Sequence, residues 1–598
     1  MKSIEIRRRA ASGYVGDWPS DLHPLIARVF AARGLGPPDL ARVRLADMAA
    51  PTALGGIANA CVLLGEAIAN NSRICIVGDF DCDGATGTAV AVRGLRLLGA
   101  RNVAYRVPNR SRDGYGLSSA LVDSLTGEET PDLIVTVDNG IASHAGVATA
   151  RARGIRVIVT DHHLPGDSLP AADAIVNPAV TRFARCSHTP QPCESCSADA
   201  RTNDAFPSRA LAGVGVMFYL LLALRAHLRV AGAFDARPEP DLAVLLDLVA
   251  LGTVADLVPL DANNRILVEA GLRRIRSGRC CAGIAALFVA AGRDMTRTVA
   301  SDLGFAIGPR INAAGRLDDM ALGIECLLCD EPGKAASLAA QLSAINSQRQ
   351  ELQSAMVEQA EAMVGSFVER YRDDALPCGI VLYEPDWHPG VVGLVASKLK
   401  ERLNRPVIAC APAESGSTEL RGSARSIAGF HLRDALAEVD ARIPGLITRF
   451  GGHAMAAGLT MPHANLERFA AQFDAVARRR ISADLLEQCV WSDGELDVGD
   501  FTFDAAQALR YAAPWGQAFA EPAFDNAFDV ESWRTVGERH LKLKLRLDGR
   551  AECLEAIMFN ALESMPPPSR VRAVYQLDVD QWNGRDRLQL LVRHLQAV

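Results

Sequence analysis

The sequence predicts an α/β protein of several domains: a parallel-sheet domain, a smaller α/β domain joined to it by a long helix, and a C-terminal β-barrel. Three observations carry this prediction. Short β-branched runs alternate with helical patterns between about residues 61 and 180. A stretch rich in Ala, Gln and Glu, without proline, runs from about 335 to 371. Short alternating strands dominate the chain after about residue 480. These patterns are typical of a doubly covered parallel sheet, a connecting helix and a small all-β domain.

The composition is that of a globular protein that works in a reducing compartment. The chain has 598 residues, of which 49% are hydrophobic and 22% charged, and its net charge is −7. A length of this kind suits roughly three to five domains. Because the net charge is negative, a polyanion could bind only at a local basic surface. The N-terminus has no apolar signal region, and the fourteen cysteines indicate free thiols in a cytoplasm.

An acidic loop follows the first expected strand, residues 74–77 (ICIV). Asp79, Asp81 and Asp83 stand at every second position, and an apolar stretch long enough for a helix follows at 85–98. The loop thus lies at the carboxyl end of a strand, where ligands bind in open α/β sheets. A divalent cation is the simplest group that neutralises three converging carboxylates. On this loop alone, an ordinary Asp-rich turn is an equally good interpretation.

Two more strands of the same sheet end in groups that can bind a metal. Further strands are expected at 102–107, 132–137, 155–160 and 173–176. Asp138 follows the strand at 132–137, and His162 and His163 follow the one at 155–160. Since the carboxyl ends of parallel strands meet at one edge, the sequence predicts a metal site there. The two histidines by themselves would suit a solvated or capping pair.

Two acids interrupt a later apolar segment, residues 242–259. A charge in such a segment is costly unless it is paired or coordinates something. Asp256 lies at the end of the run and can join the metal edge, and Asp247 is the alternative.

Glycine-containing segments supply candidate phosphate sites. In residues 309–318 (PRINAAGRLD), two arginines flank an Asn and a Gly. These arginines suit phosphate binding, and a structural ion pair is the alternative. Residues 388–390 form a His-Pro-Gly turn between an expected strand and the helix 391–403. Two Gly-rich loops follow at 421–426 and 451–453. Gly lets the backbone approach a ligand, and Ser, Arg and His bind phosphate.

The C-terminal strands carry a basic face. They are expected at 541–547, 555–559, 572–579 and 587–592. Lys542 and Lys544 alternate with leucines, and Trp533 and Trp582 are near in sequence. A basic strand face with aromatic residues nearby fits single-stranded nucleic acid binding on an OB-like barrel, and an ordinary solvated strand face is the alternative.

A cysteine cluster lies in an inserted loop of low hydrophobicity, about residues 181–207. Three cysteines and a histidine fall within eleven residues: Cys186, His188, Cys193 and Cys196. A Cys₃His set can close a structural zinc site. A lone C-x-x-C is modest evidence, and a metal-free disordered insertion is the alternative.

These motifs resemble the DHH phosphoesterase superfamily and, within it, the RecJ family of single-strand-specific 5′→3′ exonucleases. The resemblance rests on DFDCDG at Asp79–Gly84, DNG at Asp138–Gly140, DHH at Asp161–His163 and GTVAD ending at Asp256. PRINAAGR, GSARS, GGH and the C-terminal APWG and HLKLK extend it over nearly the whole chain after about residue 45.

The resemblance implies a DHH domain, a DHH-associated domain joined by a long helix, and a C-terminal OB domain, with two manganese or magnesium ions in the cleft. The implied ligands are Asp79, Asp81, Asp83, Asp138, His162, His163 and Asp256. Asp138 is the preferred bridge between the ions. The implied DNA-binding residues are Arg110, Arg310, Arg316, His388, Ser423, Arg425, His453, Lys542 and Lys544.

The implied activity is degradation of single-stranded DNA from the 5′ end to mononucleotides in repair and recombination. The expected protein is a cytoplasmic monomer that interacts with a single-strand-binding protein and a helicase. The expected domains are an N-terminal segment 1–60, a DHH domain 61–330, a connecting helix 331–371, a DHH-associated domain 372–478 and an OB-like domain 479–598. The alternatives are a phosphodiesterase for nanoRNA or cyclic dinucleotides and a non-catalytic scaffold that binds single strands.

Overall fold

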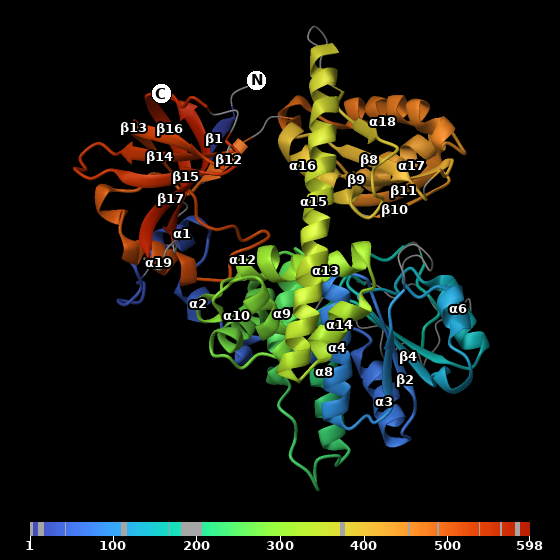
Figure 1. Ribbon diagram of the computed structural model, residues 1–598. Coiled ribbons are helices and arrows are strands. Elements are labelled where there is room, and N and C mark those ends of the chain that lie inside the picture. The colour runs from blue at the N-terminus through green and yellow to red at the C-terminus, as the bar shows by residue number, and fades with distance from the viewer. Residues whose placement is uncertain are drawn as a thin grey trace. The chain divides into compact units, whose positions relative to one another are not determined.

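In the computed structural model, the chain forms two compact units (Figure 1). One unit combines Arg8–Ala344 with Trp491–Val598, and the other contains Ile345–Val490 with the segment that ends at Arg7. The structure describes residues 4–9, 17–41, 43–108, 116–166, 168–180, 206–370, 377–414, 416–452, 455–486, 489–537, 539–561, 565–580 and 586–598.

A five-stranded parallel sheet forms the centre of the first unit, as the sequence predicts. Its strands are β2 (Ile74–Gly78), β3 (Val103–Arg106), β4 (Leu133–Val137), β5 (Arg156–Thr160) and β6 (Ala174–Val176). They lie in the order β3-β2-β4-β5-β6. Strand residues alternate between two cores: Ile74 and Ile76 belong to one hydrophobic cluster, whereas Cys75 and Val77 belong to another. The sheet is therefore buried on both faces, which explains its β-branched sequence.

Helices cover both faces of this sheet. Those that contribute to the larger core include α3 (Ile57–Ala69), α4 (Cys82–Leu98), α8 (Gly213–Val230) and α9 (Leu246–Ala255). The opposite core contains α5 (Ser119–Ser124) and α6 (His144–Ala152). By length and composition α8 could cross a membrane, but most of its apolar side chains are buried, and it packs against α3, α4 and α9, as in the core of a globular domain.

More helices follow α9 along the chain. They are α10 (Ala262–Arg276), α11 (Ala282–Ala290), the short α12 (Ala300–Asp302), a π-helical turn (Leu303–Ile307), α13 (Gly308–Leu317) and α14 (Ala321–Leu328). The expected connecting helix is α15 (Pro332–Arg370), which runs from the first unit into the second.

The C-terminal strands form a closed five-stranded barrel, as expected for an OB-like domain. Its strands are β13 (Phe524–Val536), β14 (His540–Arg546), β15 (Leu554–Met558), β16 (Arg570–Asp580) and β17 (Arg587–Ala597), preceded by α19 (Phe503–Tyr511). The N-terminal helices α1 (Pro24–Ala32) and α2 (Pro37–Ala41) belong to the same unit. Phe30 of α1 lies 5.8 Å from the ring of Trp515, which precedes the barrel. A separate two-stranded sheet pairs β1 (Glu5–Arg8) with β12 (Cys489–Ser492).

The second unit contains a five-stranded mixed sheet of order β10-β11-β9-β8-β7. Its elements are β7 (Ile380–Tyr383), α16 (Val392–Leu403), β8 (Val407–Pro412), β9 (Glu419–Arg425), α17 (Leu432–Arg442), β10 (Arg449–Gly452), β11 (Ala456–Pro462) and α18 (Leu466–Arg480). The expectation of Gly-rich loops at 421–426 and 451–453 was wrong, because both segments lie largely in strands. Glycine suits position 422 of β9, because a Cβ there would lie close to the neighbouring side chains, at 3.0 Å from Leu459 and 3.1 Å from Cys410.

Candidate metal centre

The acidic loop after β2 is held in shape by its own carboxylates. Asp81 caps α4, and its Oδ1 accepts the N–H of Gly84 at 3.0 Å. Asp79 Oδ1 accepts the N–H of Phe80 at 2.8 Å. A Cβ on Gly84 would lie 2.5 Å from the backbone oxygen of Asp79, so only glycine fits this turn. The capping bonds stabilise the start of α4 and orient the acids.

Asp83, in the first turn of α4, is fixed by the start of another helix. Its Oδ2 accepts the N–H of Gly213 at 2.6 Å, and its Oδ1 accepts the N–H of Val214 at 2.8 Å. Gly213 and Val214 open α8, whose amides favour a negative charge at that end. These donors have no signal in the sequence, because they are backbone amides and not side chains.

Replacing Gly213 by Ala should abolish metal-dependent activity. A Cβ at this position would lie 2.5 Å from Cβ of Asp138 and 2.8 Å from its Cα. Because those atoms belong to a buried strand end, either Asp138 or the amides that hold Asp83 must move. Manganese titration of full-length protein should reveal weakened binding, together with lost turnover. Gly215→Ala is the matched control, since its Cβ would lie 3.2 Å from a flexible Leu211 methyl group. Normal manganese affinity in Gly213→Ala would contradict this packing argument.

Asp138 occupies a special backbone position after β4. Its φ is 63°, in the left-handed region, which Asp tolerates better than most residues. The side chain is 1% exposed, and its Oδ1 lies 3.0 Å from Nε2 of His162. Asn139 next to it donates to the backbone oxygens of Val77 and Val137, both at 2.9 Å. Asn139 thereby ties the ends of β2 and β4 together below the acids.

Asp161, the first residue of the DHH motif, positions both histidines. Its Oδ1 accepts the backbone N–H groups of His162 at 2.7 Å and His163 at 3.1 Å, and lies 2.7 Å from Nδ1 of His163. Burial works against the charge of each partner, but their hydrogen bond raises the pKa of His163 to about 9 and lowers the pKa of Asp161 to about 2. A carboxylate on one ring nitrogen orients the other nitrogen toward a metal. This positioning role of Asp161 was not predicted from the sequence, where Asp161 is only the first letter of the DHH motif.

Asp256 joins the cluster, and Asp247 does not. Asp256 follows the last residue of α9, and its Oδ2 lies 3.5 Å from Nε2 of His162. Asp247 lies near the start of the same helix, where its Oδ2 accepts the N–H of Cys281 at 2.7 Å. Of the two candidates for the last ligand, the geometry supports Asp256.

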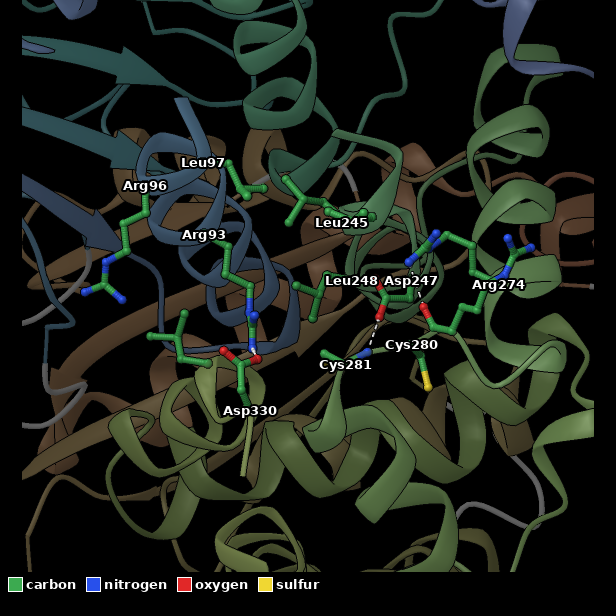
Figure 2. A pocket seen from close by; sticks show the side chains of 13 residues that line it. Arg93, Arg96, Leu97, Leu245, Asp247, Leu248, Arg274, Cys280, Cys281 and Asp330 are labelled. Carbon is green, nitrogen blue, oxygen red and sulfur yellow. Dashed lines mark hydrogen bonds and ion pairs between the residues drawn. The ribbon is translucent and has the colours of Figure 1, made fainter. Parts of the chain in front are cut away.

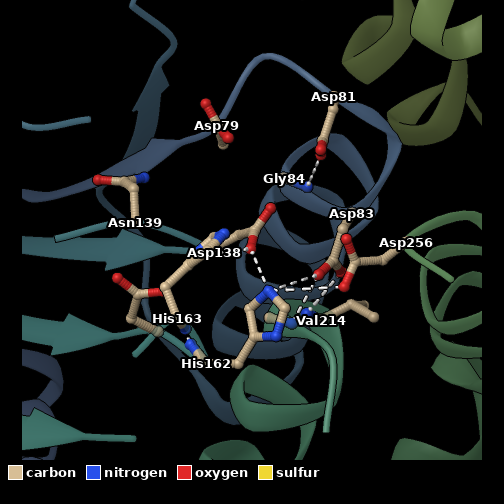
Figure 3. A network of polar contacts seen from close by, with 12 residues as sticks. Asp79, Asp81, Asp83, Gly84, Asp138, Asn139, His162, His163, Val214 and Asp256 are labelled. Carbon is tan, nitrogen blue, oxygen red and sulfur yellow. Dashed lines mark hydrogen bonds and ion pairs between the residues drawn. The ribbon is translucent and has the colours of Figure 1, made fainter. Parts of the chain in front are cut away.

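The seven candidate ligands thus converge in one place (Figure 3). They form three overlapping groups, in each of which the ligand atoms lie within 4.8 Å of one another: Asp138, His162 and His163; Asp83, His162 and Asp256; and Asp79, Asp81 and Asp138. Asp138 and His162 each belong to two groups.

The electrostatics of this cluster suit a divalent cation. Burial and the charges of Asp83 and Asp81 raise the pKa of the Asp138 carboxyl well above its usual range. The same causes raise the pKa of Asp256, and burial with the charge of Asp81 raises the pKa of Asp83 to about 7. Carboxylates that repel one another so strongly become ionised together only beside compensating positive charge. A donor set of buried oxygens and imidazoles therefore fits divalent metal ions.

Helix α13 supports the acidic loop from outside. Asn312 Oδ1 accepts the N–H of Cys82 at 2.7 Å, and a Cβ on Gly315 would lie 1.9 Å from the backbone oxygen of Phe80. Arg310 donates to Oγ of Ser343 at 3.0 Å and to the backbone oxygen of Ala306. The Asn and Gly of this motif are thus packing residues of the loop, and Arg310 is bound to neutral oxygens rather than to an acid. Arg316 lies near the end of the same helix.

Three other candidates gather at the start of α16 in the second unit. Ser423 and Arg425 lie on one face of β9, and Nη1 of Arg425 donates to Oγ of Ser423 at 3.0 Å. A Cβ on Gly393, in the first turn of α16, would lie 2.9 Å from both side chains. His388 precedes this turn, and its Nδ1 accepts the N–H of Gly390 at 3.1 Å. A helix N-terminus with an arginine and a hydroxyl is well suited to phosphate.

The barrel presents the expected basic strand only in part. Leu541, Leu543 and Leu545 of β14 are buried, so the lysines alternate with them as predicted. Lys542 lies 3.6 Å from Glu555, and Lys544 is exposed. Arg110, His453 and the cysteine cluster at Cys186, His188, Cys193 and Cys196 fall outside the described residues.

Family models match three segments of the chain. The N-terminal domain of the DHH family matches residues 73–253, the DHHA1 domain matches 377–479, and the RecJ OB domain matches 492–594. The chain is 50% identical over 597 residues to the single-stranded-DNA-specific exonuclease RecJ of Dickeya dadantii, covering 99% of both chains. It is 48% identical to the RecJ of Escherichia coli, again covering 99% of both.

Solved structures agree with this relationship. The fold is similar to RecJ from Thermus thermophilus in complex with Mn²⁺, with a TM-score of 0.76 and 30% identity, covering 99% of this chain and 80% of the other. It is also similar to an exonuclease RecJ bound to manganese, with a TM-score of 0.55 and 36% identity, over 73% of this chain and 98% of the other. The chain belongs to the RecJ family of DHH exonucleases.

Proposed function

We propose that this protein is a metal-dependent exonuclease that degrades single-stranded DNA from the 5′ end to mononucleotides, in repair and recombination. The observation that carries the proposal is the convergence of five carboxylates and two histidines at one sheet edge. Relatives at 50% and 48% identity are named as single-stranded-DNA-specific exonucleases, which supports the substrate class.

Two manganese or magnesium ions, held by Asp79, Asp81, Asp83, Asp138, His162, His163 and Asp256, would activate water and stabilise charge on the scissile phosphate when bound. The mixture of carboxylate and imidazole favours manganese. Asp138 is our choice for the bridging ligand, since it belongs to two of the three groups. Asp161 holds His163, and the amides of Gly213 and Val214 hold Asp83. This preorganised frame limits reorganisation during the reaction.

A test of this function compares 5′-labelled single strands with duplexes of the same sequence. We expect manganese-dependent release of mononucleotides from the single strand and little from the duplex. Release from short RNA or cyclic dinucleotides alone would favour the phosphodiesterase alternative, against which the closed barrel and its RecJ OB match already argue. Binding of single strands without any cleavage would favour the scaffold alternative, although all seven candidate ligands are retained.

Arg425→Ala should impair use of the 5′ end more than overall binding of long strands. The Arg425 guanidinium and the Ser423 hydroxyl lie together beside the start of α16, an arrangement suited to one phosphate. We expect the preference for a 5′-phosphorylated over a 5′-hydroxyl substrate to fall about tenfold, in line with loss of a charge-assisted hydrogen bond. Arg449→Ala, in β10 of the same sheet, is the control. An unchanged preference in Arg425→Ala would argue against a 5′-end role.

The remaining DNA contacts are proposed from the positions of these residues in the sequence motifs. Arg110, Arg310, Arg316, His388 and His453 would contact phosphates, and Lys542 and Lys544 of the barrel would contact the strand upstream or downstream of the site. Single-strand-binding protein and a helicase are proposed partners of a cytoplasmic monomer. The described cysteines all carry free thiols, which fits a reducing compartment.

A structural zinc at Cys186, His188, Cys193 and Cys196 is a separate proposal. Four protein ligands leave no open position, so this zinc would support the fold and not the reaction. Elemental analysis of protein purified without added metal should find about one zinc per chain. The Cys193→Ser/Cys196→Ser variant should lose that zinc and keep manganese-dependent cleavage. Zinc-free wild-type protein would rule the site out.

A further inference from the structure

A cavity of about 460 Å³, lined by arginine, aspartate, cysteine and leucine side chains, lies in the first unit (Figure 2). Helix α4 carries Asp83 near its N-terminal end, and Asp256 follows the C-terminal end of α9. The opposite end of each helix lines this cavity. Asp247 of the cavity precedes Asp256 by nine positions of helix, which corresponds to about 14 Å along the axis. A ligand in this cavity therefore does not reach the candidate metal ligands.

The charge of the cavity favours an anion. Four arginines line it, two from α4 and two from α10 and the turn after it: Arg93, Arg96, Arg274 and Arg279. Against them stand Asp247 and Asp330. Arg93 lies 2.7 Å from Asp330, whose side chain is 80% exposed, so this pair is solvated and opens at little cost. Guanidinium groups that line a concave surface attract phosphate.

Two polar atoms in the wall of the cavity are among the buried side-chain atoms that lack a hydrogen-bond partner in the described part of the chain. Asp247 is 1% exposed, and its Oδ2 accepts the N–H of Cys281. Its Oδ1 and the Nε of Arg274 are buried, and neither has a hydrogen-bond partner in the part of the chain that the structure describes. Buried polar atoms are nearly always satisfied in native proteins, because an unmade hydrogen bond in the interior is costly. Oδ1 requires a donor, and Nε requires an acceptor.

We propose that this cavity is a second binding site, which takes a nucleotide. The phosphate would lie on the arginines, and an N–H group of the base would donate to Oδ1 of Asp247. Leu97, Leu245 and Leu248 contribute apolar wall for the base and sugar. A bare inorganic anion binds the arginines but offers no N–H group to Oδ1 of Asp247. A molecule that carries both a phosphate and an N–H donor therefore fits better. Occupancy of this site requires no metal ion, which separates it from the proposed nuclease centre.

Calorimetric titration of the full-length protein tests the proposal, with dGMP and orthophosphate as probes. Each is titrated with manganese present and again after chelation. We expect dGMP to bind under both conditions, about tenfold or more tightly than orthophosphate, because one additional charge-assisted hydrogen bond is made. Arg274→Ala should weaken both probes by about tenfold. Arg279→Ala, at an exposed position, should do the same without risk to the fold.

Asp247→Asn distinguishes a nucleotide from a bare anion. The amide can still accept the N–H of Cys281 through its oxygen, but it presents N–H groups to the base. Affinity for dGMP should fall, and affinity for orthophosphate should stay or rise because a negative charge is removed. Arg273→Ala is the matched control, since Arg273 is adjacent on α10, is exposed and pairs with Glu269 at 2.8 Å.

Three results would overturn the proposal. Equal affinity for both probes, with Asp247→Asn changing them alike, would mean an inorganic-anion site. Binding that disappears on chelation and ignores Arg274→Ala and Arg279→Ala would place dGMP at the metal centre only. Absence of binding up to millimolar concentration would leave no second site. None of these results depends on DNA cleavage, so a failure of the proposed nuclease function is detected separately.

Discussion

Asp138→Asn is expected to lower manganese-dependent cleavage of single-stranded DNA on the order of a thousandfold, while strand binding changes little. Asp138 belongs to two of the three ligand groups, so its loss disturbs the whole centre. Affinity for the strand comes mainly from cations on phosphates, which this change leaves alone. Asn is the better test than Ala, because the residue has a φ of 63° and Asn tolerates that conformation.

The measurement combines single-turnover cleavage, strand binding in chelator, and the shift of the melting temperature by manganese. Manganese should stabilise the wild type more than Asp138→Asn, since the stabilisation by a ligand grows with the logarithm of its concentration relative to Kd. Asp132→Asn is the control: it lies just before the same strand, at the opposite end, and its side chain is 47% exposed. Cleavage within tenfold of the wild type in Asp138→Asn would remove Asp138 from the centre.

Arg33→Ala should lower the free energy of unfolding of the first unit by about 3 kcal/mol, the scale of breaking a buried ion pair. The Arg33 side chain is 10% exposed and lies 3.0 Å from Asp493, which is fully buried. It also lies over the rings of Trp515 and Phe519, at 5.1 and 5.7 Å from their centres. Among the described residues, its removal leaves the carboxylate with Arg9, at 3.2 Å, and with the backbone N–H of Ala523, at 3.0 Å.

Urea unfolding followed by tryptophan fluorescence measures this effect, and Trp515 is close to the change. Arg28→Ala on the preceding helix is the matched control. Arg28 lies 3.9 Å from Asp500, and both side chains are partly exposed, so its loss should cost less than about 1 kcal/mol. Equal losses in the two variants would mean that the buried pair does not secure the N-terminal segment to the barrel side of the unit.

Much of the candidate site was predictable because parallel strands impose a simple geometry. Their carboxyl ends share one edge, so acids and histidines after β2, β4 and β5 had to meet whatever the details of packing. The alternation of Leu541, Leu543 and Leu545 with cations likewise indicated one buried face of β14. In both cases the information is local: it lies in where a strand ends and in the alternation of side chains along a strand.

Other features depend on contacts between distant segments and left no local signal. The donors to Asp83 are backbone amides, which every residue but proline has. Asn312 and Gly315 looked like part of a phosphate motif, but their roles come from the loop at Phe80 and Cys82 against which they pack. The segment at 421–426 looked like a loop from its glycine and serine, and pairing with β8 and β11 on both sides makes it a strand.

By itself, the sequence determined the domain types, the sheet edge and the set of residues that can bind metal, because periodicity and strand ends are local properties. Only the tertiary structure places Asp256 beside His162 and Asp247 beside the backbone N–H of Cys281, although the two acids are nine positions apart in one segment of the chain. The tertiary structure alone also associated the N-terminal segment with the barrel, through Arg33 and Asp493, which are 460 residues apart. Partners at such separations are selected by packing in three dimensions, and no pattern along the chain encodes them.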